Sequence, residues 1–340
     1  MGDKMGHEID LKNYAVRTDL AIELVNGGKE NLNEDNIKVT SINLNKEDAQ
    51  KINKKPGNYI TIQFEDVTDY HNKEKVKDVL ISELGKLIKK FSLNDNSLIL
   101  VIGLGNRKST PDSLGPLVID DVLVTNPLAL YGHMEKGFKR VCALSPGVMG
   151  ETGIETSDLI LNLVNILKPD LVITIDALAA GSIERLNKTI QMTDAGINPG
   201  SGVGNKRKEI SKDTLKVPVI AIGVPTVVDA ASIVSDTINY MYKHFAYSKE
   251  KYGDPASKLQ VGVNYLEKNI DIKNDDKKNL LGIVGSLNEG DIKQLLLEIL
   301  NPLGYNLMVT PKEEDFVIEK LSSLISEAIN HTLHDKVNNI

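Results

Sequence analysis

The sequence predicts an α/β fold in which a mostly parallel β-sheet is flanked by helices. Between residues 97 and 245, apolar runs of strand length alternate with stretches of helical apolar spacing, which is typical of a parallel sheet covered on both faces. Extra strands precede this core and two helices follow it. The core is expected to contain strands at 97–102, 139–144, 171–175, 188–193 and 217–223 and helices at 112–125, 155–168 and 226–245.

The elements before the core are recognised by their periodicity. Side chains alternate between apolar and polar in 37–42 and 59–64, which predicts two half-buried strands. The apolar residues of 74–91 fall on one helical face, so this segment is expected to be an amphipathic helix.

The elements after the core are two helices that follow a charged segment. Residues 246–285 lack an apolar pattern, and we expect an exposed loop there. The C-terminal helices are expected within 286–335, the first over about 289–300. The second is expected to begin at Thr310-Pro311, in a capping box with Pro at its first position.

Composition excludes several classes of protein. The net charge of −7 argues against a dedicated nucleic-acid binder, and the one cysteine excludes an intrachain disulfide and a cysteine-rich metal site. No stretch approaches the roughly 18 apolar residues of a membrane span, and the N-terminus does not resemble a signal peptide. We therefore expect a cytoplasmic protein without direct contact to nucleic acid or membrane.

Two acidic residues follow predicted strands. Asp176 comes directly after the apolar run 171–175, and Asp112 follows the strand 97–102 through a glycine turn. The carboxyl ends of strands in an open α/β sheet carry the functional groups, so the two acids are candidates for one site. Capping of a helix would also explain Asp112, and pairing with backbone amides would explain Asp176.

Two glycine-rich segments also follow strands, at 147–153 and 198–208. Gly103-Leu104-Gly105 lacks the third glycine of a dinucleotide fingerprint, and 198–208 lacks the Ser or Thr that follows the lysine of a Walker loop. The segment 198–208 is either a flexible surface loop or a place where backbone amides approach a peptide substrate or an oxyanion. His331 and His334 could share one face of the last helix, but the sequence offers no third ligand for a zinc site. We therefore predict no cofactor and no metal.

Long ordered strings of this sequence resemble the germination protease (spore protease) family. The resemblance covers Tyr14 to about His334. The strings are Gly103-Leu104-Gly105-Asn106, Thr110-Pro111-Asp112-Ser113-Leu114-Gly115-Pro116, Pro146-Gly147-Val148-Met149-Gly150, Gly153 to Asp158, Ile175-Asp176-Ala177-Leu178-Ala179-Ala180, Pro199 to Ile210 and Leu307 to Lys312.

The resemblance implies an aspartic-type endopeptidase that degrades small acid-soluble spore proteins in the spore core during germination. It implies a homotetramer, a core similar to the hydrogenase maturation proteases, and a zymogen that removes its own N-terminus. The family's catalytic aspartates correspond to Asp112 and Asp176. Thr18-Asp19-Leu20-Ala21 is a conservative version of the family's substrate motif, so self-cleavage is expected between Asp19 and Leu20.

These implications divide the chain into a propeptide, 1–19, and a single peptidase domain, 20–340. Gly147, Gly150, Gly202 and Gly204 are expected to line the substrate cleft. Two alternatives stay open: a metal-assisted peptidase of the hydrogenase-maturation type, and a non-catalytic module that binds peptide or phosphate.

Overall fold

The computed structural model describes residues 18–25, 27–32, 37–199, 208–251, 272–300 and 307–339. The chain forms two compact units. Among the described residues, the main unit lies within Arg17–Val227 and Thr310–Ile340, and the second unit lies within Val228–Val309.

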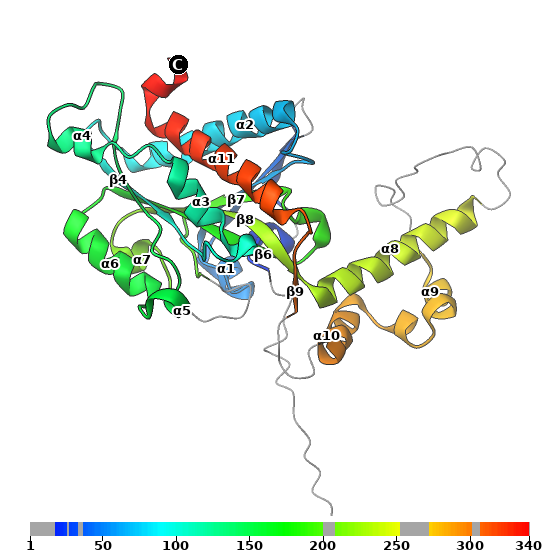
Figure 1. The fold of residues 1–340 in the computed structure, drawn as a ribbon. Coiled ribbons are helices and arrows are strands. Elements are labelled where there is room, and N and C mark those ends of the chain that lie inside the picture. Colours follow the sequence, from blue (N-terminus) through cyan, green and yellow to red (C-terminus); the bar gives the residue numbers. More distant parts are fainter. Residues whose placement is uncertain are drawn as a thin grey trace, which may run out of the picture. The chain divides into compact units, whose positions relative to one another are not determined.

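A mixed β-sheet forms the centre of the main unit (Figure 1). The strands are β1 (Lys29–Leu32), β2 (Lys38–Leu44), β3 (Gly57–Gln63), β4 (Leu98–Gly103), β5 (Arg140–Leu144), β6 (Leu171–Ala180), β7 (Thr189–Thr193) and β8 (Val219–Asp229). Their order in the sheet is β1-β2-β3-β7-β8-β6-β4-β5. Strand β4 pairs in parallel with β5 and β6, whereas β1, β2, β3, β7 and β8 pair antiparallel in succession.

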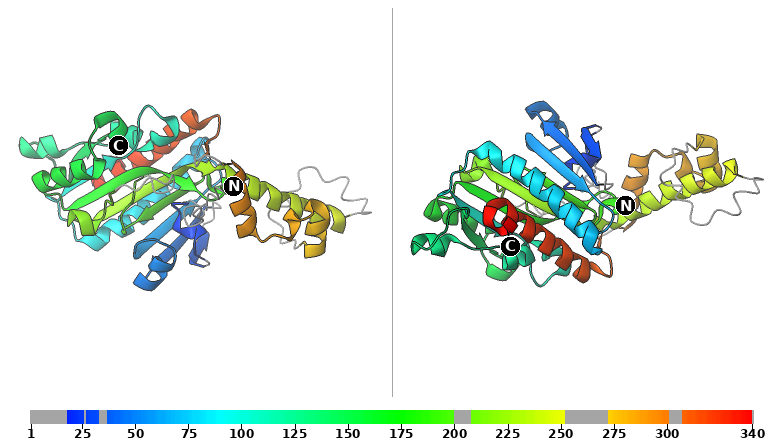
Figure 2. Two further views of the ribbon diagram at one scale, coloured as in Figure 1. Left: turned by 90° about the horizontal axis from the view of Figure 1, so that it is seen from below. Right: turned by 90° about the horizontal axis from the view of Figure 1, so that it is seen from above.

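Helices cover both faces of this sheet, which confirms the predicted α/β class (Figure 2). The helices of the main unit are α1 (Lys46–Lys51), α2 (Tyr70–Ile88), α3 (Leu114–Asp121), α4 (Asn126–Leu130), α5 (Met149–Thr152), α6 (Thr156–Leu167), α7 (Lys212–Leu215) and α11 (Glu314–Leu333). Helices α2, α3 and α11 pack on one face, and α6 and α7 pack on the other.

The alternation of side chains along β4 explains this two-sided core. Ile99 and Val101 point into the cluster that contains α2 and α11, while Leu100 and Ile102 point into the cluster that contains α6. All four side chains are at most 1% exposed. A strand buried on both faces reads as a continuous apolar run, which is why it was recognisable in the sequence.

Two strands run further than predicted. We expected β6 to cover 171–175 and to end at Asp176, but it continues to Ala180, so the expected strand end is wrong and Asp176 lies inside the strand. Strand β8 continues to Asp229, where a helix was expected from residue 226. Pro225 and the β-branched residues after it favour the extended conformation, and the side chain of Asp229 caps the helix that follows.

The second unit contains α8 (Ala230–Glu250), α9 (Asn274–Leu281), α10 (Glu289–Leu300) and β9 (Met308–Val309), which pairs with the end of β8. The predicted loop over 246–285 is therefore wrong in its described part, because α8 extends to Glu250 and α9 begins at Asn274. Asp275 and Asp276 lie in the first turn of α9, where they favour a helix without any apolar periodicity. Residues 252–271 lie outside the described residues.

The last helix begins later than predicted. Glu313 is the N-cap of α11, not Thr310, whose hydroxyl donates to the carbonyl oxygen of Thr226 at 3.0 Å. Asn187 donates to the carboxylate of Glu314 at 2.5 Å, and burial raises the pKa of this carboxyl. The Thr310 hydroxyl thus bonds to β8, and the helix has its N-cap three residues later than predicted.

Candidate active site

The turn after β4 is built from close backbone contacts. At Gly105 a Cβ atom would lie 2.1 Å from the carbonyl oxygen of Asp112, and the backbone has a φ of +112°. At Gly103 a Cβ atom would lie 2.1 Å from the carbonyl oxygen of Gly115. Both positions therefore require glycine, and the turn packs tightly against the start of α3.

Asp112 is held at the start of α3 by this turn. It ends the short 3₁₀ helix η4 (Thr110–Asp112). The backbone N–H of Asn106 donates to both the carbonyl oxygen and the carboxylate of Asp112, each at 2.9 Å. Ser109 is the N-cap of η4, and Asp112 is the acidic residue of its first turn.

Asp176 lies inside β6, beside the end of β4. Gly103 pairs with Ile175, and the N–H of Leu104 donates to the carbonyl oxygen of Ile175 at 2.8 Å. Asp176 is 5% exposed, and its carboxylate accepts a hydrogen bond from the N–H of Ala177 at 3.0 Å. The alternation along the strand directs Asp176 to the face opposite Ile175.

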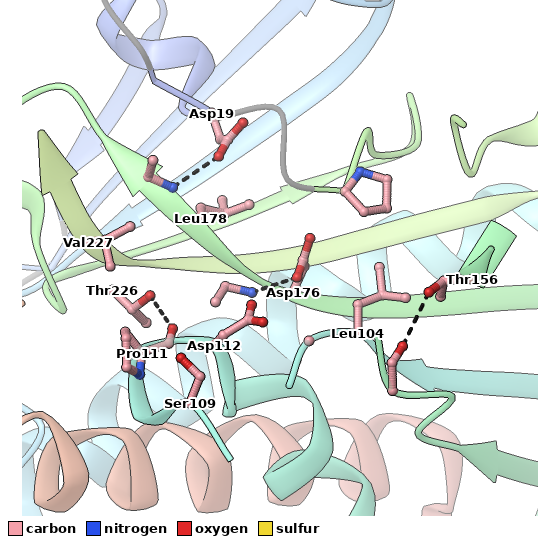
Figure 3. Close-up of a pocket in the computed structure, with 15 residues that line it drawn as sticks. Asp19, Leu104, Ser109, Pro111, Asp112, Thr156, Asp176, Leu178, Thr226 and Val227 are labelled. Carbon is pink, nitrogen blue, oxygen red and sulfur yellow. Dashed lines mark hydrogen bonds between the residues drawn. The ribbon is translucent and has the colours of Figure 1, made fainter. Parts of the chain in front are cut away.

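Asp112 and Asp176 line one pocket of about 220 Å³, and Figure 3 shows their side chains next to each other. The two acids are 64 positions apart in the sequence, and they are brought together by the pairing of β4 with β6. The pocket is also lined by Asp19, Leu104, Gly105, Ser109, Pro111, Gly147, Thr156, Ala177, Leu178, Ala179, Pro199, Thr226 and Val227.

The glycines predicted to line the cleft have different positions. Gly147 lines the pocket, and its carbonyl oxygen accepts a hydrogen bond from the Thr156 hydroxyl at 3.2 Å. Gly150 is in α5 and is not among the described residues that line the pocket. Gly202 and Gly204 lie outside the described residues.

The predicted cleavage junction lies at this pocket. Asp19 is one of the lining residues, and Leu20 is fully buried against Leu178 and Ala180 of β6. The N–H of Asp19 donates to the carbonyl oxygen of Ala179 at 3.0 Å. The chain's own N-terminal segment therefore runs beside the strand that carries Asp176. Residues 1–17 lie outside the described residues.

Sequence reasoning missed the contribution of β8 to the pocket. Thr226 and Val227 line it, and the Thr226 hydroxyl donates to the carbonyl oxygen of Pro111 at 2.6 Å, which ties β8 to η4. The β-branched run after Pro225 was the signal that could have extended the strand to these residues.

Within the described ranges, no group of three His, Cys, Asp or Glu side chains could hold a metal ion. No helix in the part of the chain that the structure describes is long and apolar enough to cross a membrane.

Comparison with known proteins identifies relatives over nearly the whole chain. A family model described as germination protease matches residues 7–340. The chain is 44% identical over 362 residues to the germination protease of Geobacillus sp. (strain WCH70), covering 98% of this chain and 97% of the relative. It is 43% identical over 355 residues to the germination protease of Bacillus velezensis (strain FZB42), covering 97% of this chain and 96% of the relative.

Among solved structures, the [NiFe] hydrogenase maturation protease HycI from Thermococcus kodakarensis matches with a TM-score of 0.28 and 20% identity. The match covers 41% of this chain and 80% of HycI. The family model and the curated relatives each span almost the full length of the sequence. The chain therefore belongs to the germination protease family.

Proposed function

We propose that this chain is an endopeptidase that starts the degradation of small acid-soluble spore proteins during spore germination, with Asp112 and Asp176 as its catalytic pair. The observation that carries the proposal is that both acids line one pocket. Membership of the germination protease family supports the peptidase activity. The resemblance further favours a homotetramer in the spore core.

Two carboxyl groups in one pocket have a definite chemistry. We propose that Asp112 and Asp176 share one proton, because like charges a few ångströms apart do not both ionise easily. The ionised carboxylate takes a proton from a water molecule, and the oxygen of that water attacks the peptide carbonyl carbon. The protonated partner first donates to the carbonyl oxygen, and a proton then passes to the leaving nitrogen as the C–N bond breaks.

The same pair would process the chain itself. We propose that the uncut chain is a zymogen and that cleavage between Asp19 and Leu20 removes residues 1–19. The position of Asp19 at the pocket supports this proposal. Water would add its oxygen to the carbonyl carbon of Asp19, and Leu20 would become the new N-terminal amine.

Single substitutions of the acids test the proposal. Asp112→Asn and Asp176→Asn should each lower the cleavage of a peptide containing Thr-Glu-Phe-Ala by a factor on the order of 10²–10⁴ and should stop self-processing. The matched control is Asp120→Asn, which removes an acid from the exposed outer side of α3, where Asp120 pairs with Arg107. Thermal unfolding should confirm that each variant is folded.

Activity above about one per cent of wild type in either pocket variant would contradict the pair mechanism. Mass spectrometry of the processed chain tests the cleavage position, and a new N-terminus other than Leu20 would exclude it. Loss of activity on exhaustive chelation, with recovery on adding a metal, would favour the metal-assisted alternative.

A further inference from the structure

The peptide group that precedes Asp112 is hydrogen-bonded at both of its ends. On one side, the N–H of Asp112 donates to the carbonyl oxygen of Ser109 at 2.8 Å, within the same turn. On the other side, the carbonyl oxygen of Pro111 accepts from the Thr226 hydroxyl at 2.6 Å. A peptide group is planar, so these two bonds fix its orientation, and that orientation sets the direction in which the Asp112 side chain leaves the backbone.

The two bonds come from different parts of the chain. The bond to Ser109 is local to η4, whereas Thr226 lies 115 positions after Pro111 and belongs to β8. Strand β8 is the neighbour in the sheet of β6, the strand that contains Asp176. The Thr226 hydroxyl therefore connects the turn that carries Asp112 to the sheet that carries Asp176 (Figure 3).

Strand β8 is itself held firmly around Thr226. The carbonyl oxygen of Thr226 accepts a hydrogen bond from the Thr310 hydroxyl at 3.0 Å. At Gly223 of β8, a Cβ atom would lie 2.6 Å from the Leu178 side chain of β6, so the two strands approach each other closely. Thr226 is 0% exposed, and a hydrogen bond from a buried hydroxyl is stronger than one in water. The bond to η4 thus comes from a fixed and shielded position.

The chemistry of an acid pair is sensitive to such a bond. Each carboxyl group must lie within hydrogen-bond reach of the proton that it moves. A displacement of about 1 Å in a reacting group can lower the rate by about 100-fold. A residue that fixes the backbone before Asp112 can therefore affect the rate without touching the substrate.

We propose that Thr226 is a positioning residue whose hydroxyl keeps the Asp112 carboxyl at its working distance from the Asp176 carboxyl. It does so through the carbonyl oxygen of Pro111, and Thr310 supports it by holding the Thr226 backbone. The inference rests on the proposed function for the chemical step alone, because the hydrogen bonds are present whichever reaction the two acids perform.

Removal of the hydroxyl tests the proposal in the self-processed protein. Thr226→Val replaces the hydroxyl by a methyl group of similar size, and it should lower kcat for a peptide containing Thr-Glu-Phe-Ala by about 10–100-fold while KM changes little. Thr226→Ser retains a hydroxyl and should keep kcat close to that of the wild type. The matched control is Thr40→Val, because Thr40 is a buried threonine of β2 whose hydroxyl has no hydrogen-bond partner among the described residues.

The pH dependence of kcat separates positioning from a general loss of folded protein. Carboxyl groups that lie further apart repel each other less, so the proton that they share is lost at a lower pH. For charges about 4 Å apart at an effective dielectric constant of about 20, a further 1 Å corresponds to about half a pH unit. The alkaline limb of kcat should move to lower pH by about this amount in Thr226→Val, and it should not move in Thr226→Ser or Thr40→Val. Asp19, the other acid among the described residues that line the pocket, leaves with residues 1–19 and does not contribute to this limb.

A second readout does not depend on cleavage. Nuclear magnetic resonance of full-length chains with ¹³C-labelled aspartate, assigned with Asp112→Asn and Asp176→Asn, follows the titration of the two carboxyl groups. Their two apparent pKa values should lie closer together in Thr226→Val than in the wild type. If they do so but the wild type cuts no peptide, the proposed function fails and the positioning role of Thr226 stands.

Thr310→Val provides a second variant that leaves the bond to Pro111 in place. It loosens β8 and should change kcat and its alkaline limb in the same direction as Thr226→Val but less, which keeps the test decisive if Thr226→Val does not fold. Equal kcat in Thr226→Val and Thr40→Val would overturn the proposal. A lower kcat in Thr226→Val with an unmoved alkaline limb and an unchanged titration would also overturn it, because the hydroxyl would then serve stability alone.

Discussion

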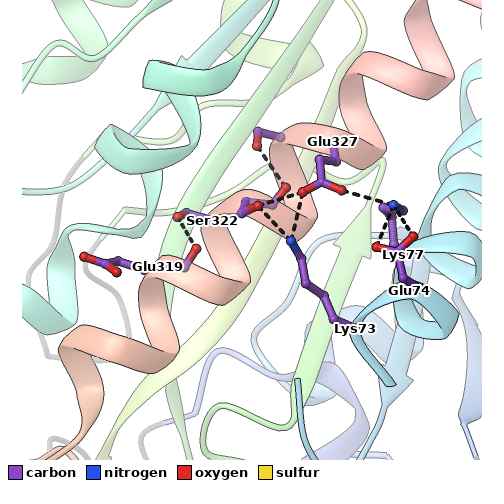
Figure 4. Close-up of polar contacts among 8 residues, drawn as sticks. Lys73, Glu74, Lys77, Glu319, Ser322 and Glu327 are labelled. Atoms are coloured by element: carbon purple, nitrogen blue, oxygen red, sulfur yellow. Dashed lines mark hydrogen bonds and ion pairs between the residues drawn. The ribbon is translucent and has the colours of Figure 1, made fainter. Parts of the chain in front are cut away.

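Replacing Glu327 by Gln should make the protein less stable near neutral pH, with an effect that fades in acid. Glu327 on α11 faces two lysines of α2 (Figure 4). The Lys73 ammonium lies 2.8 Å from one carboxylate oxygen, and the Lys77 ammonium lies 3.0 Å from the other. The Ser323 hydroxyl donates to the same carboxylate at 2.7 Å. The lysine side chains are only 13% and 11% exposed.

The pKa of Glu327 gives the size of the effect. Burial raises the pKa, but the hydrogen bonds from Lys73, Ser323 and Lys77 outweigh burial and lower it from 4.5 to about 2. That difference corresponds to ~3 kcal/mol of stability. The carboxylate side chain is 36% exposed, and solvent screening reduces the expected contribution to about 1–2 kcal/mol.

The direction of the pH dependence follows from the lowered pKa. Between pH 4.5 and about 2, the unfolded chain binds a proton at Glu327 and the folded chain does not. The contribution of Glu327 is therefore fully present above pH 4.5 and is lost as the pH falls toward 2. Urea unfolding of the wild type and of Glu327→Gln, from pH 7 down to the lowest pH at which both fold, measures it.

The free energies of unfolding of the two proteins should differ by about 1–2 kcal/mol at pH 7 and should converge in acid. The control is Glu135→Gln, which breaks a solvent-exposed pair with Lys336 and should leave the free energy of unfolding nearly unchanged. If Glu327→Gln lowers the free energy of unfolding by the same amount at pH 7 and in acid, the electrostatic reasoning is refuted.

Two further predictions concern packing. Gly105→Ala should lower the free energy of unfolding by at least about 2 kcal/mol and abolish peptide cleavage, because the new methyl group would meet the carbonyl oxygen of Asp112. Gly85 lies in α2, and nothing lies within 4 Å of a Cβ added there. Gly85→Ala should therefore raise the free energy of unfolding by about 0.5–1 kcal/mol, and a lower melting temperature would contradict the argument. Leu80→Ala should lower the free energy of unfolding, measured in urea, by about 2–5 kcal/mol because Leu80 is fully buried. Ile166→Ala, at a position that is 77% exposed, should change this free energy little. Similar losses in both variants would be inconsistent with the described core.

The parts of the fold that were predictable from the sequence are those with an unambiguous local period. The continuous apolar run of β4 and the one-sided helix α2 needed no information from the rest of the chain. Strand β6 was predicted too short because a charge followed Ile175, and a charge is normally a sign of solvent. Long-range contacts keep Asp176 inside the strand, and no local pattern reports them.

The candidate site was partly predictable for the same reason. Asp112 and Asp176 could be proposed as neighbours because each follows an apolar run of strand length, and parallel strands end at one edge of a sheet. Lys54 and Gln191 both donate to the carbonyl oxygen of Asp19, and the sequence could not predict these contacts. Lys54 lies in the connection before β3, Gln191 is a buried polar residue of an antiparallel strand, and both contacts depend on where the N-terminal segment runs.

In the register between β4 and β6, Gly103 lies opposite Ile175. This register determines the face of the sheet to which the Asp176 side chain points. Side chains alternate with a period of two, so a slip by one residue would turn Asp176 toward the helices on the other face and replace it with an apolar neighbour. A chain that made this error would keep most of its strands but would have no acid pair. The self-cleavage proposed above would therefore report correct strand pairing, because Asp112 and Asp176 line one pocket only when the two strands are aligned in this way.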